Sequence, residues 1–163
     1  MDPQHSQSLE ILRQTPRTLA GLTADLPEGA LDFRASPEEW TTREILAHLV
    51  DDEMYVMRTR LERIIKEDRP DLAPHDEQMW YANRNTTRDA LTELLDDFAL
   101  QRAASLGIIE MLREEDWMRE GYQPEYGHFT ASAWLGRWAE HDTTHLKQIE
   151  SNLESYRTRV RRS

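Results

Sequence analysis

Residues 41–66 read TTREILAHLVDDEMYVMRTRLERIIK, and this stretch decides the fold class. Thr41 and Glu44 have the spacing of a capping box, in which a hydroxyl and a carboxylate three residues apart satisfy free N–H groups where a helix begins. Apolar residues follow at helical spacing, in a stripe wide enough to pack on two neighbours: Ile45, Leu46, Leu49, Val50, Met54, Met57, Leu61, Ile64 and Ile65. We therefore predict a long, largely buried helix from about Thr42 to Lys66.

The same periodicity predicts three further helices. They are expected from about Ser6 to Leu26, Thr87 to Leu112 and Thr130 to Tyr156. Pro16 lies inside the first of these, where a proline removes a backbone hydrogen bond, so we expect that helix to bend or to begin late. Four long helices without a clearly alternating strand predict an all-α protein with a four-helix bundle.

The connections between these helices differ in length. About Asp68 to Asn85 forms a long irregular link between the second and third helices. Such a link is unusual in a compact domain and indicates either a functional segment or a crossover along the bundle. We expect a crossover at this position. The segment from Trp117 to His128, with two glycines and a proline, is expected to be a loop.

Composition excludes several classes of protein. The 163 residues fit one domain spanning 1–163, and the absence of cysteine excludes disulfides and thiolate ligands from this chain. The formal net charge of -11 disfavours binding to nucleic acid, which needs a basic surface, and binding to anionic membranes. No secretory signal is recognisable at the start, and no run reaches the ~18 apolar residues of a membrane span, so we expect a cytoplasmic protein.

Two histidines in the fourth predicted helix are candidate metal ligands. His141 and His145 are four residues apart, which places both rings on one face of a helix. The apolar stripe of that helix passes through Trp134, Trp138, His141, His145 and Ile149. Buried imidazoles need partners for a donor and an acceptor, and a divalent metal such as zinc, nickel, iron or copper provides one. Hydrogen bonds to Asp142 or Glu140 are the alternative.

His48 is the third candidate ligand, because it lies among apolar residues near the start of the second predicted helix. Three imidazoles leave a coordination position open, as in catalytic zinc sites, whereas structural zinc usually takes four protein ligands. A core histidine with satisfied hydrogen bonds is the alternative interpretation of His48. The remaining histidines are weaker candidates, one near the terminus and two in loops: His5, His75 and His128.

With these residues in place, the chain resembles the DinB superfamily. Residues 40–49, WTTREILAHL, are similar to the family pattern W-s-x-x-E-x-x-x-H-l, and residues 138–149, WAEHDTTHLKQI, are similar to its H-D-x-x-H-x-x-Q-I signature. Residues 76–80 resemble the acidic and aromatic segment of the family. The resemblance implies a four-helix bundle with a crossover and a metal, commonly zinc or nickel. The implied ligands are His48, His141 and His145.

The resemblance implies two classes of function. Some members resemble thiol-dependent S-transferases or isomerases that use bacillithiol, mycothiol or glutathione. A metal-dependent transferase or hydrolase of a small molecule is therefore expected, with the metal lowering the pKa of a water or of an added low-molecular-weight thiol. The alternative is a non-catalytic bundle, stabilised by metal or binding a small molecule, associated with stress. A homodimer is an option in either case.

Four residues are candidate acids, bases or supporting groups of the site: Asp52, Glu53, Tyr55 and Asp76. Asp52 follows His48 by one helical turn, and Tyr55 follows it by seven residues, which would place Tyr55 on the same face two turns on. Asp76 lies in the long link. Solvated or capping roles are the alternatives for the acids, and a solvated or packing role is the alternative for Tyr55.

Overall fold

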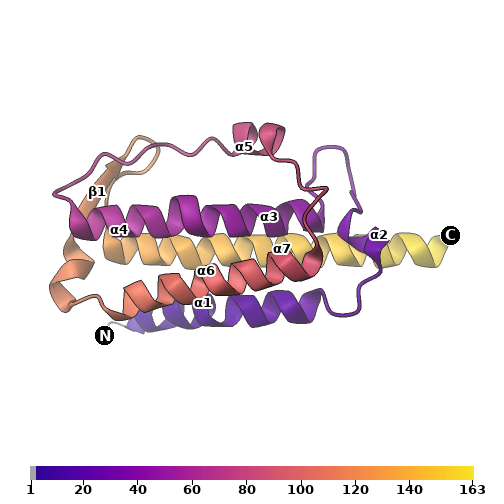
Figure 1. The fold of residues 1–163 in the computed structure, drawn as a ribbon, viewed down its shortest axis with the longest axis horizontal. Coiled ribbons are helices and arrows are strands. Elements are labelled where there is room, and N and C mark those ends of the chain that lie inside the picture. The colour runs from indigo at the N-terminus through magenta and orange to yellow at the C-terminus, as the bar shows by residue number, and fades with distance from the viewer. Residues whose placement is uncertain (1–2) are drawn as a thin grey trace.

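Four long helical rods lie side by side in the computed structural model, which describes residues 3–163 (Figure 1). The predicted all-α, four-helix bundle is confirmed, with boundaries that differ by several residues. The first rod is α1 (Pro3–Leu22). The second is continuous and consists of α3 (Thr42–Asp52), the π-helical segment η1 (Glu53–Arg58) and α4 (Thr59–Lys66). The third and fourth are α6 (Leu91–Glu110) and α7 (Ala131–Arg162). A short helix, α2 (Glu28–Leu31), lies between the first two rods.

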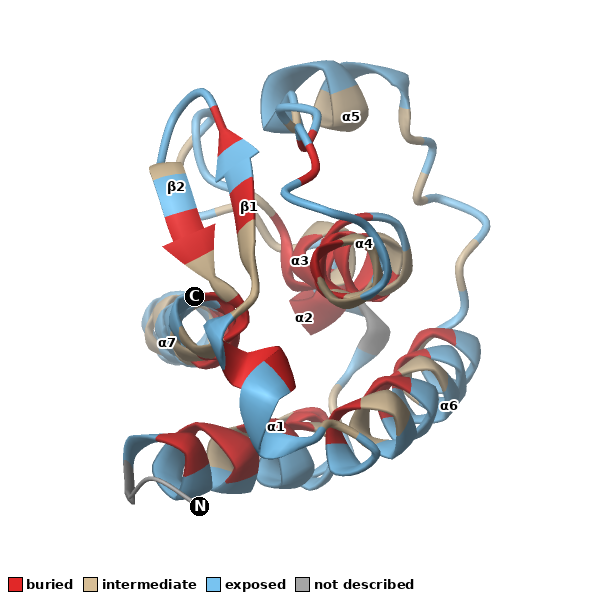
Figure 2. Cartoon of the chain, turned by 90° about the vertical axis from the view of Figure 1, so that its left-hand side faces the viewer, coloured by how far each residue is buried: buried red, intermediate tan, exposed pale blue. Residues whose placement is uncertain are grey.

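The order of the rods around the bundle explains the long link. α1 packs against α6 and α7, and α3 also packs against α6 and α7, so α1 and α3 lie on a diagonal (Figure 2). The rod of α3 and α4 runs in the same direction as α6, while α1 and α7 run the opposite way (Figure 1). Because α4 ends where α6 ends, the chain must return along the whole bundle before α6 begins. The predicted crossover is confirmed.

The crossover is not wholly irregular, as we had expected, because it contains the helix α5 (Glu77–Asn83). Asp76 caps this helix by accepting a hydrogen bond from the backbone N–H of Met79 at 2.9 Å. Trp80 Nε1 and Arg84 Nε both donate to Asp51 Oδ2 of α3, at 2.8 and 2.9 Å. These bonds hold the link against the bundle near the end of α3.

Pro16 does not interrupt α1, and the expected late start is wrong: the helix begins at Pro3 and continues to Leu22. Proline has no N–H, so the carbonyl of Leu12, four residues earlier, loses its helical donor. Arg102 of α6 replaces that donor, with Nη1 2.8 Å from Leu12 O. A side chain from a neighbouring helix therefore satisfies the carbonyl that Pro16 leaves free.

The π-helical segment changes which residues of its rod face inward. One extra residue per turn rotates the helix faces relative to an α-helix, and such segments are frequent at functional sites. Tyr55 is consequently 68% exposed, whereas His48 is fully buried. The predicted shared face of these two residues is wrong. The side chains of Thr59 and Trp134 donate to carbonyls of the segment, those of Met54 and Met57, at 2.8 and 2.9 Å.

The segment expected to be a loop, Trp117 to His128, instead overlaps the end of a short 3₁₀ helix, η2 (Glu114–Met118), and forms most of a β-hairpin. Strands β1 (Glu120–Gln123) and β2 (Gly127–Thr130) pair antiparallel. Gln123 Oε1 accepts hydrogen bonds from two backbone N–H groups of the turn, and Gly127 has φ +72, a conformation in which glycine is favoured. Tyr122 of β1 also exchanges backbone hydrogen bonds with residues 70 and 72, so the hairpin secures the start of the crossover.

A buried network of charges connects all four rods. Arg102 of α6 donates to both oxygens of Glu53, at 2.8 Å each, and to both oxygens of Asp142 of α7, at 2.6 and 3.0 Å. Thr15 of α1 donates to Asp142 Oδ2 at 2.7 Å. Burial makes unpaired charges costly, so this network favours one arrangement of the rods.

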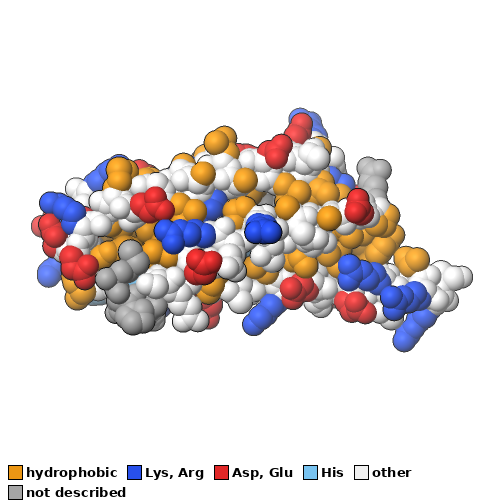
Figure 3. All heavy atoms as spheres, turned by 90° about the horizontal axis from the view of Figure 1, so that it is seen from below, with side chains coloured by type: hydrophobic (Ala, Val, Ile, Leu, Met, Phe, Trp, Pro, Cys, Tyr) orange, Lys and Arg blue, Asp and Glu red, His pale blue; other side chains and the backbone are white. Residues whose placement is uncertain are grey.

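The surface carries charges of both signs. Seen from below, Figure 3 shows acidic and basic side chains interspersed with apolar ones, and this face has no continuous basic stripe. Among residues 3–163, no helix has the combined length and apolar character needed to cross a membrane.

Candidate metal centre

Three imidazoles converge inside the bundle. His48 comes from α3, and His141 and His145 come from α7. The Nε2 atoms of His48 and His141 are 3.3 Å apart, and the ring of His145 lies 4.7 Å from that of His48 and 4.4 Å from that of His141, between centroids. One ring nitrogen of each residue lies within 4.8 Å of the others. The structure thus brings the three predicted ligands to one point.

The local sequence explains why His48 is held in place. The capping box at the start of α3 forms as predicted: Thr41 Oγ1 accepts from the N–H of Glu44 at 3.2 Å, and Glu44 Oε2 accepts from the N–H of Thr41 at 2.7 Å. His48 follows one turn later, with the edges of Trp40 and Trp80 packed against its ring at 5.1 Å each. The capping box and the two indole rings together fix the position of the His48 ring in the first half of α3.

Asp52, His75 and Glu77 complete the cluster. Asp52 Oδ2 lies 3.3 Å from Nε2 of both His48 and His141, and Asp52 Oδ1 lies 3.1 Å from His75 Nε2. Glu77 Oε1 lies 3.4 Å from His48 Nε2. Sequence reasoning included Asp52 but treated His75 as a weak candidate and missed Glu77. Both missed residues belong to the crossover, whose path no periodicity reveals; the resemblance of residues 76–80 was the one available signal.

Gln148 orients the third imidazole. Nδ1 of His145 lies 2.7 Å from Gln148 Oε1, three residues further along α7. An amide oxygen accepts, so this contact places the proton on Nδ1 and leaves Nε2 free to bind a metal. The Nδ1 atoms of His48 and His141 are buried and have no hydrogen-bond partner among the described residues. Among the described residues, hydrogen bonding through the outer nitrogen therefore orients the ring of His145 and neither of the other two.

The surroundings of the rings determine which of them carry a proton. Burial lowers the pKa of His48 to about 3 and that of His145 to about 4, with neighbouring histidines adding to both effects. Burial opposes the charge on His141 as well, but the carboxylates of Asp142 and Asp52 raise its pKa to about 9. Two imidazoles are thus neutral at pH 7, the state that binds a metal, and one holds a proton.

Asp52 stays ionised even though it is buried. Burial alone would raise the pKa of its carboxyl group, but the contacts with His141 and His75 hold that pKa well below its usual range. The same contact with Asp52 raises the pKa of His75. The cluster therefore presents a negative oxygen next to its imidazole nitrogens.

These donors fit a divalent metal ion. Imidazole nitrogen suits zinc and nickel, and a carboxylate oxygen is a common additional ligand of zinc. Four buried polar atoms of the cluster have no hydrogen-bond partner among the described residues: His48 Nδ1, Asp52 Oδ1, His75 Nε2 and His141 Nδ1. The two Nδ1 atoms are outer ring nitrogens, which an ion bound to Nε2 would leave to water, so the fit to a metal rests on the converging Nε2 atoms and on Asp52.

Metal binding is expected to release about one proton at pH 7, because His141 must lose its proton to become a ligand. Apparent affinity should then fall about tenfold for each unit of pH between pH 9 and pH 7 as the pH decreases. Calorimetric titration of zinc at pH 7 and pH 8, in buffers of different ionisation enthalpy, counts the protons directly. An affinity independent of pH over this range would contradict the assignment.

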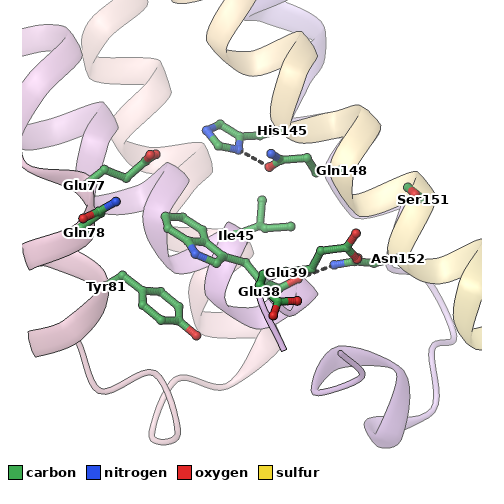
Figure 4. Close-up of a pocket in the computed structure, with 11 residues that line it drawn as sticks. Glu38, Glu39, Ile45, Glu77, Gln78, Tyr81, His145, Gln148, Ser151 and Asn152 are labelled. Atoms are coloured by element: carbon green, nitrogen blue, oxygen red, sulfur yellow. Dashed lines mark hydrogen bonds between the residues drawn. The ribbon is translucent and has the colours of Figure 1, made fainter. Parts of the chain in front are cut away.

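The cluster opens onto a pocket of about 500 Å³ between α5 and α7 (Figure 4). His145 and Glu77 belong both to the cluster and to the pocket wall. Figure 4 shows Glu77, Gln78 and Tyr81 of α5 facing His145 and Gln148 of α7. The other lining residues are Glu38, Glu39, Trp40, Ile45, Ser151 and Asn152.

The remaining predicted site residues lie away from this pocket. Glu53 is buried and binds Arg102, and its Oε2 accepts a hydrogen bond from Trp138 Nε1 at 3.0 Å. Tyr55 is exposed on the outside of its rod, and the carboxylate of Asp76 caps α5. None of Glu53, Tyr55 and Asp76 lines the pocket.

Two further histidines take no part in the cluster. His5 is buried against Trp117, with 4.4 Å between ring centroids, and its Nε2 contacts Ser132 Oγ at 2.5 Å. His128 is exposed on β2.

The fold and the cluster define a helical-bundle protein with a candidate metal centre of three histidines. The profile of the DinB superfamily matches residues 11–149, so the chain belongs to this family, as its motifs suggested. A protein of Oceanobacillus iheyensis, named as a candidate metal-dependent hydrolase, is 28% identical over 86% of this chain and 80% of its own. A similarly named protein of Bacillus licheniformis is 29% identical over 83% of this chain and 79% of its own.

A solved structure has the same fold. YfiT from Bacillus subtilis, described as a candidate metal-dependent hydrolase with an unusual four-helix bundle topology, superimposes with a TM-score of 0.84 at 20% identity. The match covers 93% of this chain and 87% of YfiT. The parallel arrangement of the α3–α4 rod and α6, with its long crossover, is thus an arrangement that this chain shares with a known protein.

Proposed function

We propose that the protein is a metal-dependent hydrolase that acts on a small molecule bound between α5 and α7. The observation that carries the proposal is the shared wall: His145 and Glu77 belong both to the ligand cluster and to the pocket of about 500 Å³. Pockets of this size hold small-molecule ligands. The names of the relatives from Oceanobacillus and Bacillus support the same class of reaction.

The residues that would hold the ion are His48, His141 and His145, with zinc or nickel as the proposed metal. When bound, such an ion would polarise a substrate carbonyl and would lower the pKa of a water molecule bound to it to near neutrality. Gln148 keeps His145 in the tautomer whose Nε2 faces the cluster. The rods position all three rings before substrate arrives, so little reorganisation is needed.

Glu77 is the proposed general base and acid. Its carboxylate reaches to 3.4 Å from His48 Nε2, yet its side chain is 53% exposed and faces the pocket. A group in this position can accept a proton from a water at the cluster and return it to a leaving group. Glu53 is enclosed by Arg102 and Trp138, so it has no comparable access to a substrate.

The charge of the pocket favours hydrolysis over transfer from an anionic thiol. Three carboxylates, those of Glu38, Glu39 and Glu77, line it, and no lysine or arginine is among the lining residues of the described chain. Glutathione and bacillithiol carry carboxylates of their own, which such a pocket repels. Trp40 and Tyr81, stacked at 5.1 Å with 9° between their planes, offer an aromatic wall to an apolar part of the substrate.

Glu77→Gln is expected to lower kcat for metal-dependent hydrolysis by about 10²–10⁴-fold, because the amide cannot transfer the proton. The zinc-loaded and nickel-loaded proteins would be tested on aryl esters, lactones and anilides, with metal content measured in each variant. Metal content should be unchanged, since Glu77 is half exposed and lies near one nitrogen of the cluster, whereas the buried Asp52 lies near two.

Glu140→Gln is the matched control, because Glu140 lies next to His141 in sequence but is exposed outside the pocket. It should retain the rate of the unchanged protein. Absence of metal-dependent hydrolysis with all three substrate classes would count against the hydrolase and favour a metal-stabilised binding protein. Turnover that appears only after a low-molecular-weight thiol is added would favour the transferase.

A further inference from the structure

Asp52 has contacts that neither a solvated carboxylate nor a hydrogen-bonded one would make. Its side chain is 5% exposed, and Oδ2 is equidistant, at 3.3 Å, from Nε2 of His48 and Nε2 of His141. Those two nitrogens are themselves 3.3 Å apart. One oxygen and two nitrogens thus form a triangle with equal sides.

The sides of this triangle are too long for charge-assisted hydrogen bonds, which measure about 2.7–2.9 Å. They match the spacing of ligands on a common ion, because atoms bound 2.0–2.1 Å from a tetrahedral metal lie about 3.3–3.4 Å from one another. His145 approaches the same point, with a ring nitrogen within 4.8 Å of those of His48 and His141. The triangle thus places Asp52 Oδ2 as a further donor beside the two ring nitrogens of His48 and His141.

Within residues 3–163, the ion-pair contacts of Asp52 are all with imidazoles, those of His48, His75 and His141, and none is with a lysine or arginine. The buried guanidinium of Arg102 is engaged by Glu53 and Asp142. His75 approaches Asp52 Oδ1 to 3.1 Å, but the two atoms lack the alignment of a hydrogen bond and both have no hydrogen-bond partner among the described residues. A buried carboxylate in such surroundings is stable when it coordinates a metal.

We propose that Asp52 is a fourth protein ligand of the metal, through Oδ2, so that three imidazoles and one carboxylate hold the ion. The spacing His48-x-x-x-Asp52 on α3 then parallels His141-x-x-x-His145 on α7, and each helix contributes two donors one turn apart. This inference rests on the metal centre proposed above. Water or substrate would then bind as a fifth ligand, a coordination number that catalytic zinc can reach in the transition state.

The test exploits the absence of cysteine from the chain. In Asp52→Cys, a thiolate would replace the carboxylate, and bound Co²⁺ should show an intense near-ultraviolet charge-transfer band from sulfur in addition to its visible bands. Cysteine is tolerated at buried positions, and a coordinating thiol is deprotonated by the metal. Ser151→Cys, which lines the pocket away from the cluster, is the matched control and should give no such band.

Asp52→Asn provides a second measurement, which does not depend on how the cysteine variant folds. Loss of the anionic ligand should change the visible bands of Co²⁺ and lower zinc affinity by more than about 100-fold, beyond the range for groups that merely support a ligand. Two results would overturn the proposal. One is that the visible bands of Asp52→Asn superimpose on those of the unchanged protein at equal Co²⁺ occupancy; the other is that Asp52→Cys binds Co²⁺ without a charge-transfer band. Failure of the unchanged protein to bind Co²⁺ would instead remove the metal centre.

Discussion

Replacing His145 with alanine is expected to lower the affinity for zinc or nickel by more than about 100-fold, and His48→Ala should do the same. Residues that only support a metal ligand are already worth about 10–100-fold, and these imidazoles are proposed as the ligands themselves. Each ring is buried, so no other side chain at the surface can move in to replace it. Metal analysis of protein purified without a histidine tag, together with competition against a chelator, measures the loss.

The matched control is His128→Ala, which removes an exposed histidine of β2 that is outside the cluster. It should bind metal like the unchanged protein. Metal should also raise Tm in the control and in the unchanged protein, since a ligand that binds only the folded state stabilises it, but not in the two site variants. Stoichiometric metal in both His48→Ala and His145→Ala would refute this centre.

Arg102→Met is expected to lower the free energy of unfolding by about 3–5 kcal/mol, because it leaves the carboxylates of Glu53 and Asp142 buried and unpaired. The loss is a large part of the roughly 5–15 kcal/mol that stabilises a typical domain. It also removes the donor to Leu12 O in α1. Urea unfolding followed by circular dichroism would measure it, and Tm should fall by about 2–4 °C per kcal/mol.

Arg13→Met is the control, since Arg13 makes an exposed ion pair with Glu110 at 3.1 Å and should change stability by less than about 1 kcal/mol. Combining Arg102→Met with Glu53→Gln and Asp142→Asn should recover part of the loss, because no charge is then left buried without a partner. Equal stability of Arg102→Met and Arg13→Met would show that the network does not hold the rods together.

The sequence was sufficient to predict the bundle, the crossover and the convergence of His48, His141 and His145. The bundle and the inward direction of His141 and His145 follow from helical periodicity. The crossover was predicted from the length of the link, and the grouping of His48 with the other two histidines from the resemblance to the DinB superfamily. The effect of Pro16 was mispredicted for a different reason. Its cost depends on whether another group satisfies the Leu12 carbonyl, and that group, Arg102, is distant in sequence.

Other features depended on departures from regular helix and on the path of the link. The π-helical segment begins at Glu53 and turns Tyr55 to solvent, although counting in α-helical steps places Tyr55 with His48. His75 and Glu77 come from a segment without period, so only the folded chain shows that they reach the cluster. The hairpin strands have four residues each, too few for an alternating pattern to stand out.

The crossover divides the centre into two parts that differ in how freely they can change. Helix-borne ligands are tied to the packing of the interior, so altering them puts the fold itself at risk. The crossover, which carries Glu77 and Tyr81, runs outside the rods. Hydrogen bonds to Asp51 hold one part of it, and hydrogen bonds to the hairpin hold its start. Substitutions and changes of length in the crossover can therefore accumulate during evolution without destabilising the bundle. In this architecture, the substrate can thus change with little loss of stability.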